Sequence, residues 1–219
     1  MFLKVKYFFA DLRFNQKWYL TFLYHVLPSK SVPKPYLHAT SHSYMKFKRI
    51  SRYSLLLLLL IFCIGFCIPQ HFIMPVKGAT NKSYSDDSFW FYPWGKSVTH
   101  KGVDIFARSG TDVRASTSGL VVYTGTLGRG GNVAIVLGPK WRFHYYAHLK
   151  EIKTSTCSFV NAGSTIGSVG NTGNAAGKPS HLHYSVSSML PLPWRIDHSR
   201  QGWKKMFYLN PIEYLKQIN

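Results

Sequence analysis

The sequence THKGVDI at residues 99–105 is the first of three short motifs that decide the fold of this chain, and the others are YAHL at 146–149 and SHLHY at 180–184. Alternate side chains of a β-strand point to one face, so on strands His100 and Asp104 share a face, as do His181 and His183. Gly102 lies between the first two and has no side chain to separate them. The motifs therefore predict a cluster of imidazoles and a carboxylate on β-structure.

Short β-branched runs alternate with glycine-rich breaks through the second half of the chain. The runs occupy residues 103–107, 119–126, 132–137, 143–148 and 182–186. This spacing is typical of strands joined by tight turns, and the region has no 3.6-residue apolar stripe. We expect a mainly β fold of antiparallel sheets that form a groove, with a short helix at residues 211–217.

An apolar run at residues 55–68 follows a basic segment and falls short of the ~20 residues that cross a bilayer squarely. Its length and charge predict either a signal-peptide h-region or a membrane anchor. We expect a basic segment at 1–53, the h-region or anchor at 54–68, a linker at 69–88, and the domain that carries the three motifs, with a C-terminal tail, at 89–219.

Two interpretations of the N-terminus remain open. In the first, translation begins at Met45, residues 1–44 come from an over-extended gene model, and the apolar run is cleaved as a signal peptide. In the second, the N-terminus is cytoplasmic and the run is an uncleaved anchor in the inner membrane. Both interpretations predict that the domain is exported to the periplasm, the cell envelope or the medium.

The charge of the chain favours an anionic neighbour. Lys and Arg number 27 against 8 Asp and Glu, which gives a formal net charge of +19. An anionic wall polymer or a membrane surface fits this charge. Nucleic acid is excluded as a partner, because the chain has no dense basic helix, no paired-Cys finger and no aromatic RNA-binding signature. Cys157 is the only cysteine of the expected domain, so no disulfide is expected there, and nothing predicts the oligomeric state.

The residue types in the three motifs suit a catalytic zinc site. Such a site uses three protein ligands and keeps a fourth position for water, and five His and Asp positions offer three ligands and two bases. Asp112 is a rival carboxylate, but the surrounding sequence is typical of a turn before a strand, so Asp104 is preferred. We expect ordinary polar roles for His71, His144 and His198, which lack such a context.

Taken together, the motifs resemble the lysostaphin/LytM-type zinc metalloendopeptidases, which cut peptidoglycan peptides on a duplicated hybrid motif fold. The resemblance covers about residues 89–186 and rests on HKGVDI at 100–105, GTDVRA at 110–115, GLVV at 119–122, GNVAI at 131–135, YAHL at 146–149, the glycine-rich stretch at 163–173 and HLHY at 181–184. It implies one Zn²⁺ ion held by His100, Asp104 and His183. It also implies that His148 and His181 are the catalytic pair and that an extended peptide stem or cross-bridge occupies the groove.

The resemblance leaves two alternatives to a wall-remodelling enzyme. Relatives without their ligands act as non-catalytic wall-binding scaffolds or amidase activators, but this chain keeps all five residues. A toxin-like lytic role is the other alternative.

The chain also departs from the family pattern. Some relatives carry a Tyr before the first His, where Trp94 stands close and Tyr92 is a candidate, and Ser185 stands where many have an acid. The bond cleaved is expected to depend on loops at residues 127–131 and 188–202.

Overall fold

The computed structural model describes residues 52–218, and the chain divides into two compact units, residues 1–57 and 58–219. Met45 and most of the expected basic segment lie outside the described residues. Residues 52–67 are helical. Across residues 52–218, no helix combines the length and the apolar character that crossing a membrane requires. The second unit carries the three motifs and is described below.

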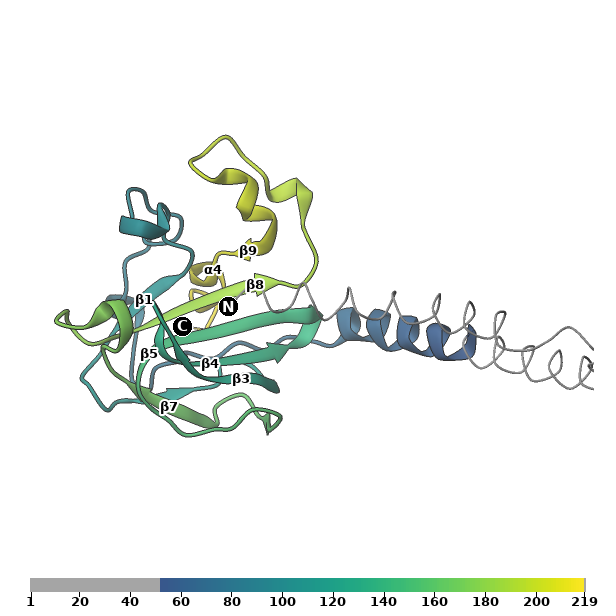
Figure 1. Cartoon of the computed structure of the whole chain (residues 1–219), viewed down its shortest axis with the longest axis horizontal. Coiled ribbons are helices and arrows are strands. Elements are labelled where there is room, and N and C mark those ends of the chain that lie inside the picture. The colour runs from purple at the N-terminus through teal and green to yellow at the C-terminus, as the bar shows by residue number, and fades with distance from the viewer. Residues whose placement is uncertain (1–51, 219) are drawn as a thin grey trace, which may run out of the picture. The chain divides into compact units, whose positions relative to one another are not determined.

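The second unit is built on one open sheet in which every strand pairing is antiparallel (Figure 1). The strands are β1 (Val103–Phe106), β2 (Asp112–Arg114), β3 (Gly119–Leu127), β4 (Gly131–Gly138), β5 (Arg142–Ile152), β6 (Phe159–Val160), β7 (Thr165–Val169), β8 (His181–Ser188) and β9 (Tyr208–Leu209). The main order is β1-β8-β5-β4-β3-β6, β7 pairs with β5 and β2, and β9 pairs with β8. The predicted mainly β, antiparallel fold is confirmed.

The five predicted runs coincide with β1, β3, β4, β5 and β8, but the sequence did not reveal four strands. Three of these, β2, β6 and β9, are only two or three residues long. The fourth, β7, is buried along its last four residues, so it has none of the alternation that marks a half-buried strand. Strand prediction failed where a strand was short or buried on both faces.

From residue 81 onward, the helices of the second unit are short. The 3₁₀ helices are η2 (Asn81–Ser83), η3 (Gly95–Ser97), η4 (Pro139–Trp141), η5 (Gly173–Ala175), η6 (Pro193–Arg195) and η7 (Gly202–Phe207), and the α-helix is α4 (Pro211–Leu215). Asn210 caps α4 by accepting a hydrogen bond from the Ile212 amide, and Pro211 suits the first turn. The short helix expected at residues 211–217 is therefore confirmed.

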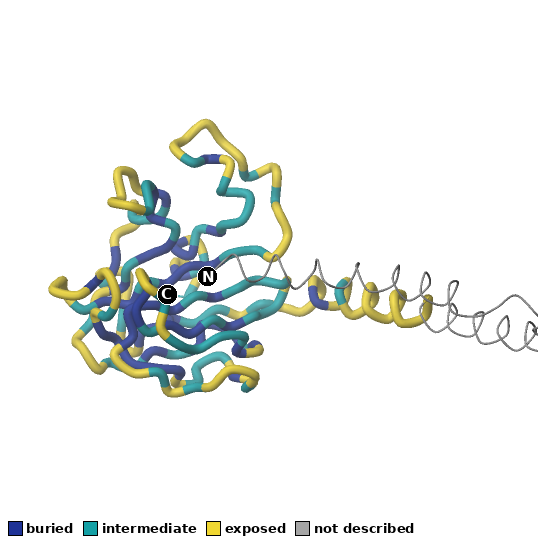
Figure 2. Tube along the Cα trace, viewed as in Figure 1, coloured by how far each residue is buried: buried dark blue, intermediate teal, exposed yellow. Residues whose placement is uncertain are grey.

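Buried residues follow the strands of the sheet, and the connecting loops are mostly exposed (Figure 2). Part of the expected linker, residues 69–88, belongs to this core. Val76 forms a β-bridge with Val113 and is fully buried, and Met74 and Tyr84 join the same apolar cluster. Burial of these side chains removes apolar surface from water, so this segment helps to hold the sheet together.

Candidate active site

The pairing of β1 with β8 brings the first and third motifs together. Asp104 lies directly opposite His183, and Phe106 lies opposite His181. His100 differs from the expectation, because β1 begins only at Val103 and His100 lies in the preceding loop. Its backbone hydrogen-bonds with Trp90 and Phe91 instead, which aims its ring at the end of β1.

Gly102 allows this approach for a reason that the sequence did not reveal. A Cβ atom at this position would lie 2.5 Å from the carbonyl oxygen of Tyr184 and 3.0 Å from two ring atoms of His183. These contacts are shorter than van der Waals separations, so a side chain would displace the His183 ring. The glycine makes room for a neighbouring imidazole.

Three candidate ligand atoms converge on one point. His183 Nδ1 lies 2.8 Å from Asp104 Oδ1, and His100 Nε2 lies 3.1 Å from the same oxygen and 3.0 Å from His183 Nδ1. In a tetrahedral zinc site with bonds of about 2.0–2.1 Å, neighbouring ligand atoms are about 3.3 Å apart. The observed spacings are close to this value. The His100 ring is 1% exposed, so the cluster is largely shielded from water.

Three of the four histidines at the site are held in orientation by hydrogen bonds to backbone carbonyls, and His183 is the exception. Nδ1 of His100, His148 and His181 lies 2.8 Å from the carbonyl oxygens of Ser88, Thr172 and Pro179, in that order. Since a carbonyl oxygen only accepts, each Nδ1 carries the proton, and in the neutral ring each Nε2 keeps its lone pair. Such carbonyl partners are typical of metal-binding imidazoles.

These tautomers supply the test of whether the residues fit a metal. His100 Nε2 and Asp104 Oδ1 are both electron-pair donors, yet they lie 3.1 Å apart in a part-buried site. Two atoms that both present lone pairs repel each other at this distance unless a shared proton or a cation lies between them. Two imidazoles and one carboxylate are hard-to-borderline ligands that suit Zn²⁺, so the donor set fits the ion.

The charges of the cluster agree with this arrangement. Burial on its own would raise the pKa of Asp104, but its contacts with the imidazoles of His100 and His183 outweigh burial and lower the pKa well below its usual range. Burial lowers the pKa of His183, partly offset by its hydrogen bond with Asp104. Both directions favour the ionised carboxylate and the neutral imidazole, which are the forms that bind metal.

His148 and His181 lie beside this cluster. The two ring centroids are 5.1 Å apart, and His181 Nε2 lies 3.8 Å from Asp104 Oδ2. His148 enters the cavity because its backbone is left-handed, with a φ of 62°, where the pairing of β5 shifts its register. Burial lowers the pKa of His148 to about 4, so its Nε2 is unprotonated at neutral pH.

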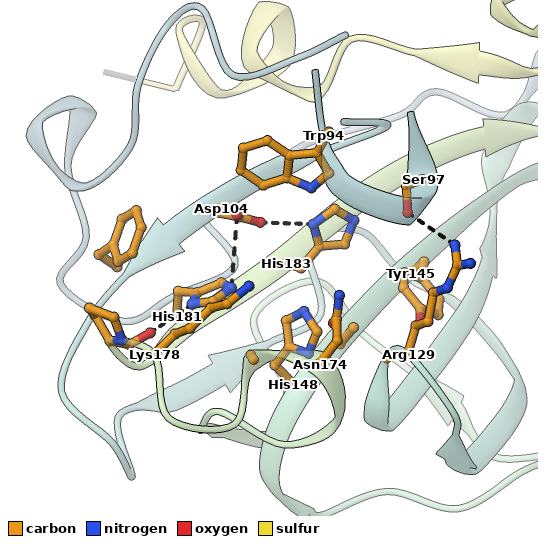
Figure 3. A pocket seen from close by; sticks show the side chains of 15 residues that line it. Trp94, Ser97, Asp104, Arg129, Tyr145, His148, Asn174, Lys178, His181 and His183 are labelled. Atoms are coloured by element: carbon orange, nitrogen blue, oxygen red, sulfur yellow. Dashed lines mark hydrogen bonds and ion pairs between the residues drawn. The ribbon is translucent and has the colours of Figure 1, made fainter. Parts of the chain in front are cut away.

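Four of the five residues, Asp104, His148, His181 and His183, border a cavity of about 440 Å³ (Figure 3). The ring centroids of Trp94 and His100 are 4.2 Å apart. Of the two candidates for an extra donor, Trp94 lines this cavity, whereas Tyr92 is 53% exposed and does not. The indole N–H is thus the available donor on this side.

The remaining candidates lie elsewhere. Asp112 lies at the start of β2 and forms ion pairs with Lys153 and Lys77, so it does not join the cluster. His71 and His198 are exposed. His144 is not an ordinary surface position: it is fully buried, with Nδ1 2.7 Å from the Tyr184 hydroxyl. Burial lowers its pKa to about 3, with a further contribution from the charge of Arg142.

The loops expected to govern specificity have different roles. Arg129 and Gly130 of the 127–131 loop line the cavity, whereas no residue of 188–202 does. Gln201 instead accepts a hydrogen bond from Lys101, and the Arg200 carbonyl accepts one from the Trp90 indole. The second loop therefore supports the segment that carries His100.

Sequence reasoning missed several lining residues, among them Arg129, Tyr145, Asn174 and Lys178. Tyr145 was expected only to pack across strands, but it borders two cavities, and burial raises its pKa to about 12. Its alternation with the buried Tyr146 on β5 could have indicated this exposed face. No comparable pattern marks the loop residues.

The chain is similar to known peptidases in sequence and in structure. Residues 98–191 match the model of Peptidase family M23. The chain is 36% identical over 104 residues to DD-carboxypeptidase/endopeptidase Mpg of Neisseria meningitidis serogroup B, covering 43% of this chain and 24% of that protein. It is 36% identical over 126 residues to L-Ala--D-Glu endopeptidase of Bacillus subtilis, covering 52% of this chain and 37% of that protein. The match thus spans well under half the length of these relatives.

Among solved structures, the antimicrobial peptidase lysostaphin from Staphylococcus simulans has a TM-score of 0.50 at 26% identity, and the similarity covers 66% of this chain and 55% of lysostaphin. The family match at residues 98–191 spans all five residues. The resemblance to the lysostaphin/LytM-type endopeptidases is therefore confirmed, and residues 98–191 form a Peptidase family M23 domain.

Proposed function

We propose that this chain is an exported zinc-dependent endopeptidase that hydrolyses peptide stems or cross-bridges of bacterial peptidoglycan. The observation that carries the proposal is the convergence of His100 Nε2, Asp104 Oδ1 and His183 Nδ1 beside two further imidazoles. Relatives named as peptidoglycan or peptide endopeptidases support the substrate class.

In the proposed enzyme, the three converging atoms hold one Zn²⁺ ion. Bound zinc lowers the pKa of a water molecule toward ~7 and polarises the scissile carbonyl. The chain's own residues then move protons and orient the peptide. His148 and His181 each present an unprotonated Nε2 to the cavity, so either can accept the proton of the attacking water.

The same imidazoles serve the second half of the reaction. An imidazole that has taken a proton can donate it to the leaving amine, and its charge stabilises the oxyanion until then. His181 is the more constrained of the two, because Asp104 Oδ2 lies 3.8 Å from its Nε2.

The open sheet face favours an extended peptide. β8 and β5 lie side by side beneath the cavity, with Tyr145 and Ala147 on β5 and His181 and His183 on β8 (Figure 3). A second cavity of about 410 Å³ continues along the same sheet past Tyr145 and His183. A peptide along these cavities would pass directly over the candidate ligands.

Export follows from the apolar run that precedes the domain and is part of this proposal. The net charge of +19 would hold the enzyme on anionic wall polymer or at a membrane surface, and salt would weaken that attraction.

Purified peptidoglycan tests the proposal. The protein should release soluble peptide-linked fragments, a chelator should stop the release, and added zinc should restore it. Mass analysis of the new amino termini would identify the cleaved bond. Failure of the folded, zinc-loaded protein to release fragments from several wall types would contradict the enzyme and favour a wall-binding scaffold.

A further inference from the structure

The cavity at the candidate active site continues into a strongly basic one. This third cavity, of about 530 Å³, shares five lining residues with the active-site cavity: Trp94, Ser97, Arg129, Asn174 and Lys178. Lys96 adds a third cation to its lining, and no carboxylate lines it. In the first cavity the only carboxylate is Asp104, which the candidate metal site uses.

The three cations are not neutralised within the part of the chain that the structure describes. None of Lys96, Arg129 and Lys178 forms an ion pair there. Four acidic residues form ion pairs with other partners: Asp86, Asp104, Asp112 and Asp197. The three side chains come from three separate loops, so their gathering at one cavity is a product of the fold.

Arg129 links these loops. Its guanidinium donates a hydrogen bond to Ser97 Oγ at 3.2 Å in η3, the helix that carries Lys96 (Figure 3). Its carbonyl oxygen accepts a hydrogen bond of 3.0 Å from the Asn174 amide, in the loop that leads to Lys178. Gly173 permits this contact, because a Cβ there would lie 2.4 Å from that oxygen.

We infer that this basic cavity is a subsite for a carboxylate of the substrate, next to the bond that is cut. The inference rests on the proposed function and narrows its substrate class to peptides with a free carboxylate near the cleaved bond, as opposed to neutral or amidated ones. A guanidinium matches the two oxygens of a carboxylate, and the two ammonium groups add attraction that the carboxamide lacks.

The test of this subsite compares native peptidoglycan with amidated peptidoglycan, in which the carboxylates have been converted to carboxamides. The groove variant replaces all three cations (K96Q/R129Q/K178Q), and the matched control (K82Q/K140Q/K150Q) removes the same charge from exposed lysines that line neither cavity. Full-length proteins are compared for fragment release as a function of wall concentration and for co-sedimentation with each wall. Comparing these two variants separates the local effect from the overall positive charge.

The wild type and the matched control should half-saturate on native wall at a concentration about 10-fold lower than on amidated wall, since three exposed charge pairs of this kind together give roughly that factor. The groove variant should lose this preference, because its half-saturating concentration on native wall should rise to that on amidated wall. R129K should keep only part of the preference, because an ammonium group keeps the charge but not the paired donors of the guanidinium. A groove variant that keeps the preference, or a wild type without one, would overturn the subsite.

The two proposals fail differently. Absence of fragment release from both walls contradicts the endopeptidase, and co-sedimentation then still decides the subsite. The subsite is supported if the wild type and the matched control bind native wall more tightly than amidated wall and the groove variant does not. Equal binding of both walls by all three proteins overturns it.

Discussion

His148 illustrates how far single residues could be predicted. The YAHL motif and its resemblance to the lysostaphin/LytM-type endopeptidases predicted that His148 belongs to the site, where an imidazole suits acid–base chemistry. Its left-handed backbone, which turns the ring into the cavity, left no trace in the sequence. Arg129 and Lys178 were missed as lining residues for a similar reason: both lie in loops without periodicity, where only the folded chain sets their position.

Replacing His148 with Gln should separate chemistry from metal binding. Because His148 borders the candidate ligands without belonging to the converging atoms, the variant should keep about one zinc per chain while fragment release slows by about 10²–10⁴-fold. Metal analysis and fragment release measured on the same preparation check this. Loss of zinc from the variant would instead make His148 a ligand.

His144 should make stability depend on pH. Above about pH 6.5 the imidazole is neutral in the folded and the unfolded chain, so it has no effect there. Its folded pKa is about 3, because it is buried. As pH falls from about 6.5 toward 3, only the unfolded chain binds this proton, and the free energy of unfolding drops by up to about 1.4 kcal/mol per pH unit.

Denaturant unfolding of the wild type and of His144→Gln at pH 7, 6 and 5 isolates this contribution. The difference in the free energy of unfolding between the two proteins should shift in favour of the variant as pH falls. A difference that stays constant over this range would show that His144 does not titrate in this way.

At the scale of elements, strands with alternating or β-branched sequence were predictable and the rest were not. The pairing of β1 with β8 places Asp104 opposite His183, and period-two alternation correctly predicted that His181 and His183 face the same side of their strand. The position of His100 before β1 could not be predicted, since strand boundaries depend on pairing partners distant in sequence. The burial of Met74 and Val76 escaped prediction because their segment is too short to show a pattern.

Gly102→Ala should disturb the junction of β1 and β8. The added methyl group would meet the Tyr184 carbonyl and the His183 ring, and relief of this contact requires a shift of the candidate ligand. We expect a loss of about 1–3 kcal/mol in the free energy of unfolding, together with weaker zinc binding.

Gly128→Ala is the matched control, because a Cβ atom at that position meets nothing within 4 Å. It should change neither the stability nor the affinity for zinc to a comparable extent. Equal effects of the two substitutions would contradict the proposed role of Gly102.

At the scale of the whole molecule, the candidate metal site joins segments 83 residues apart in the chain. A ligand that binds only the folded chain stabilises it, by about 2.7 kcal/mol at a concentration 100 times its dissociation constant. For a protein of this size, removal of zinc by a chelator should therefore lower the Tm by about 5–11 °C.

Asp104→Asn should abolish this response, because a carboxamide is a much weaker zinc ligand than the ionised carboxylate. Thermal unfolding with and without chelator checks both proteins. An equal chelator effect on the two would place the metal elsewhere in the chain.

The measurement that tests the account most directly is an anomalous difference map at the zinc absorption edge from crystals of the zinc-loaded protein. The account predicts one peak within coordination distance of three named atoms, His100 Nε2, Asp104 Oδ1 and His183 Nδ1, with His148 and His181 facing it from the cavity. A peak bound by His148 or His181 in place of one of these atoms, or no peak at this cluster, would contradict it.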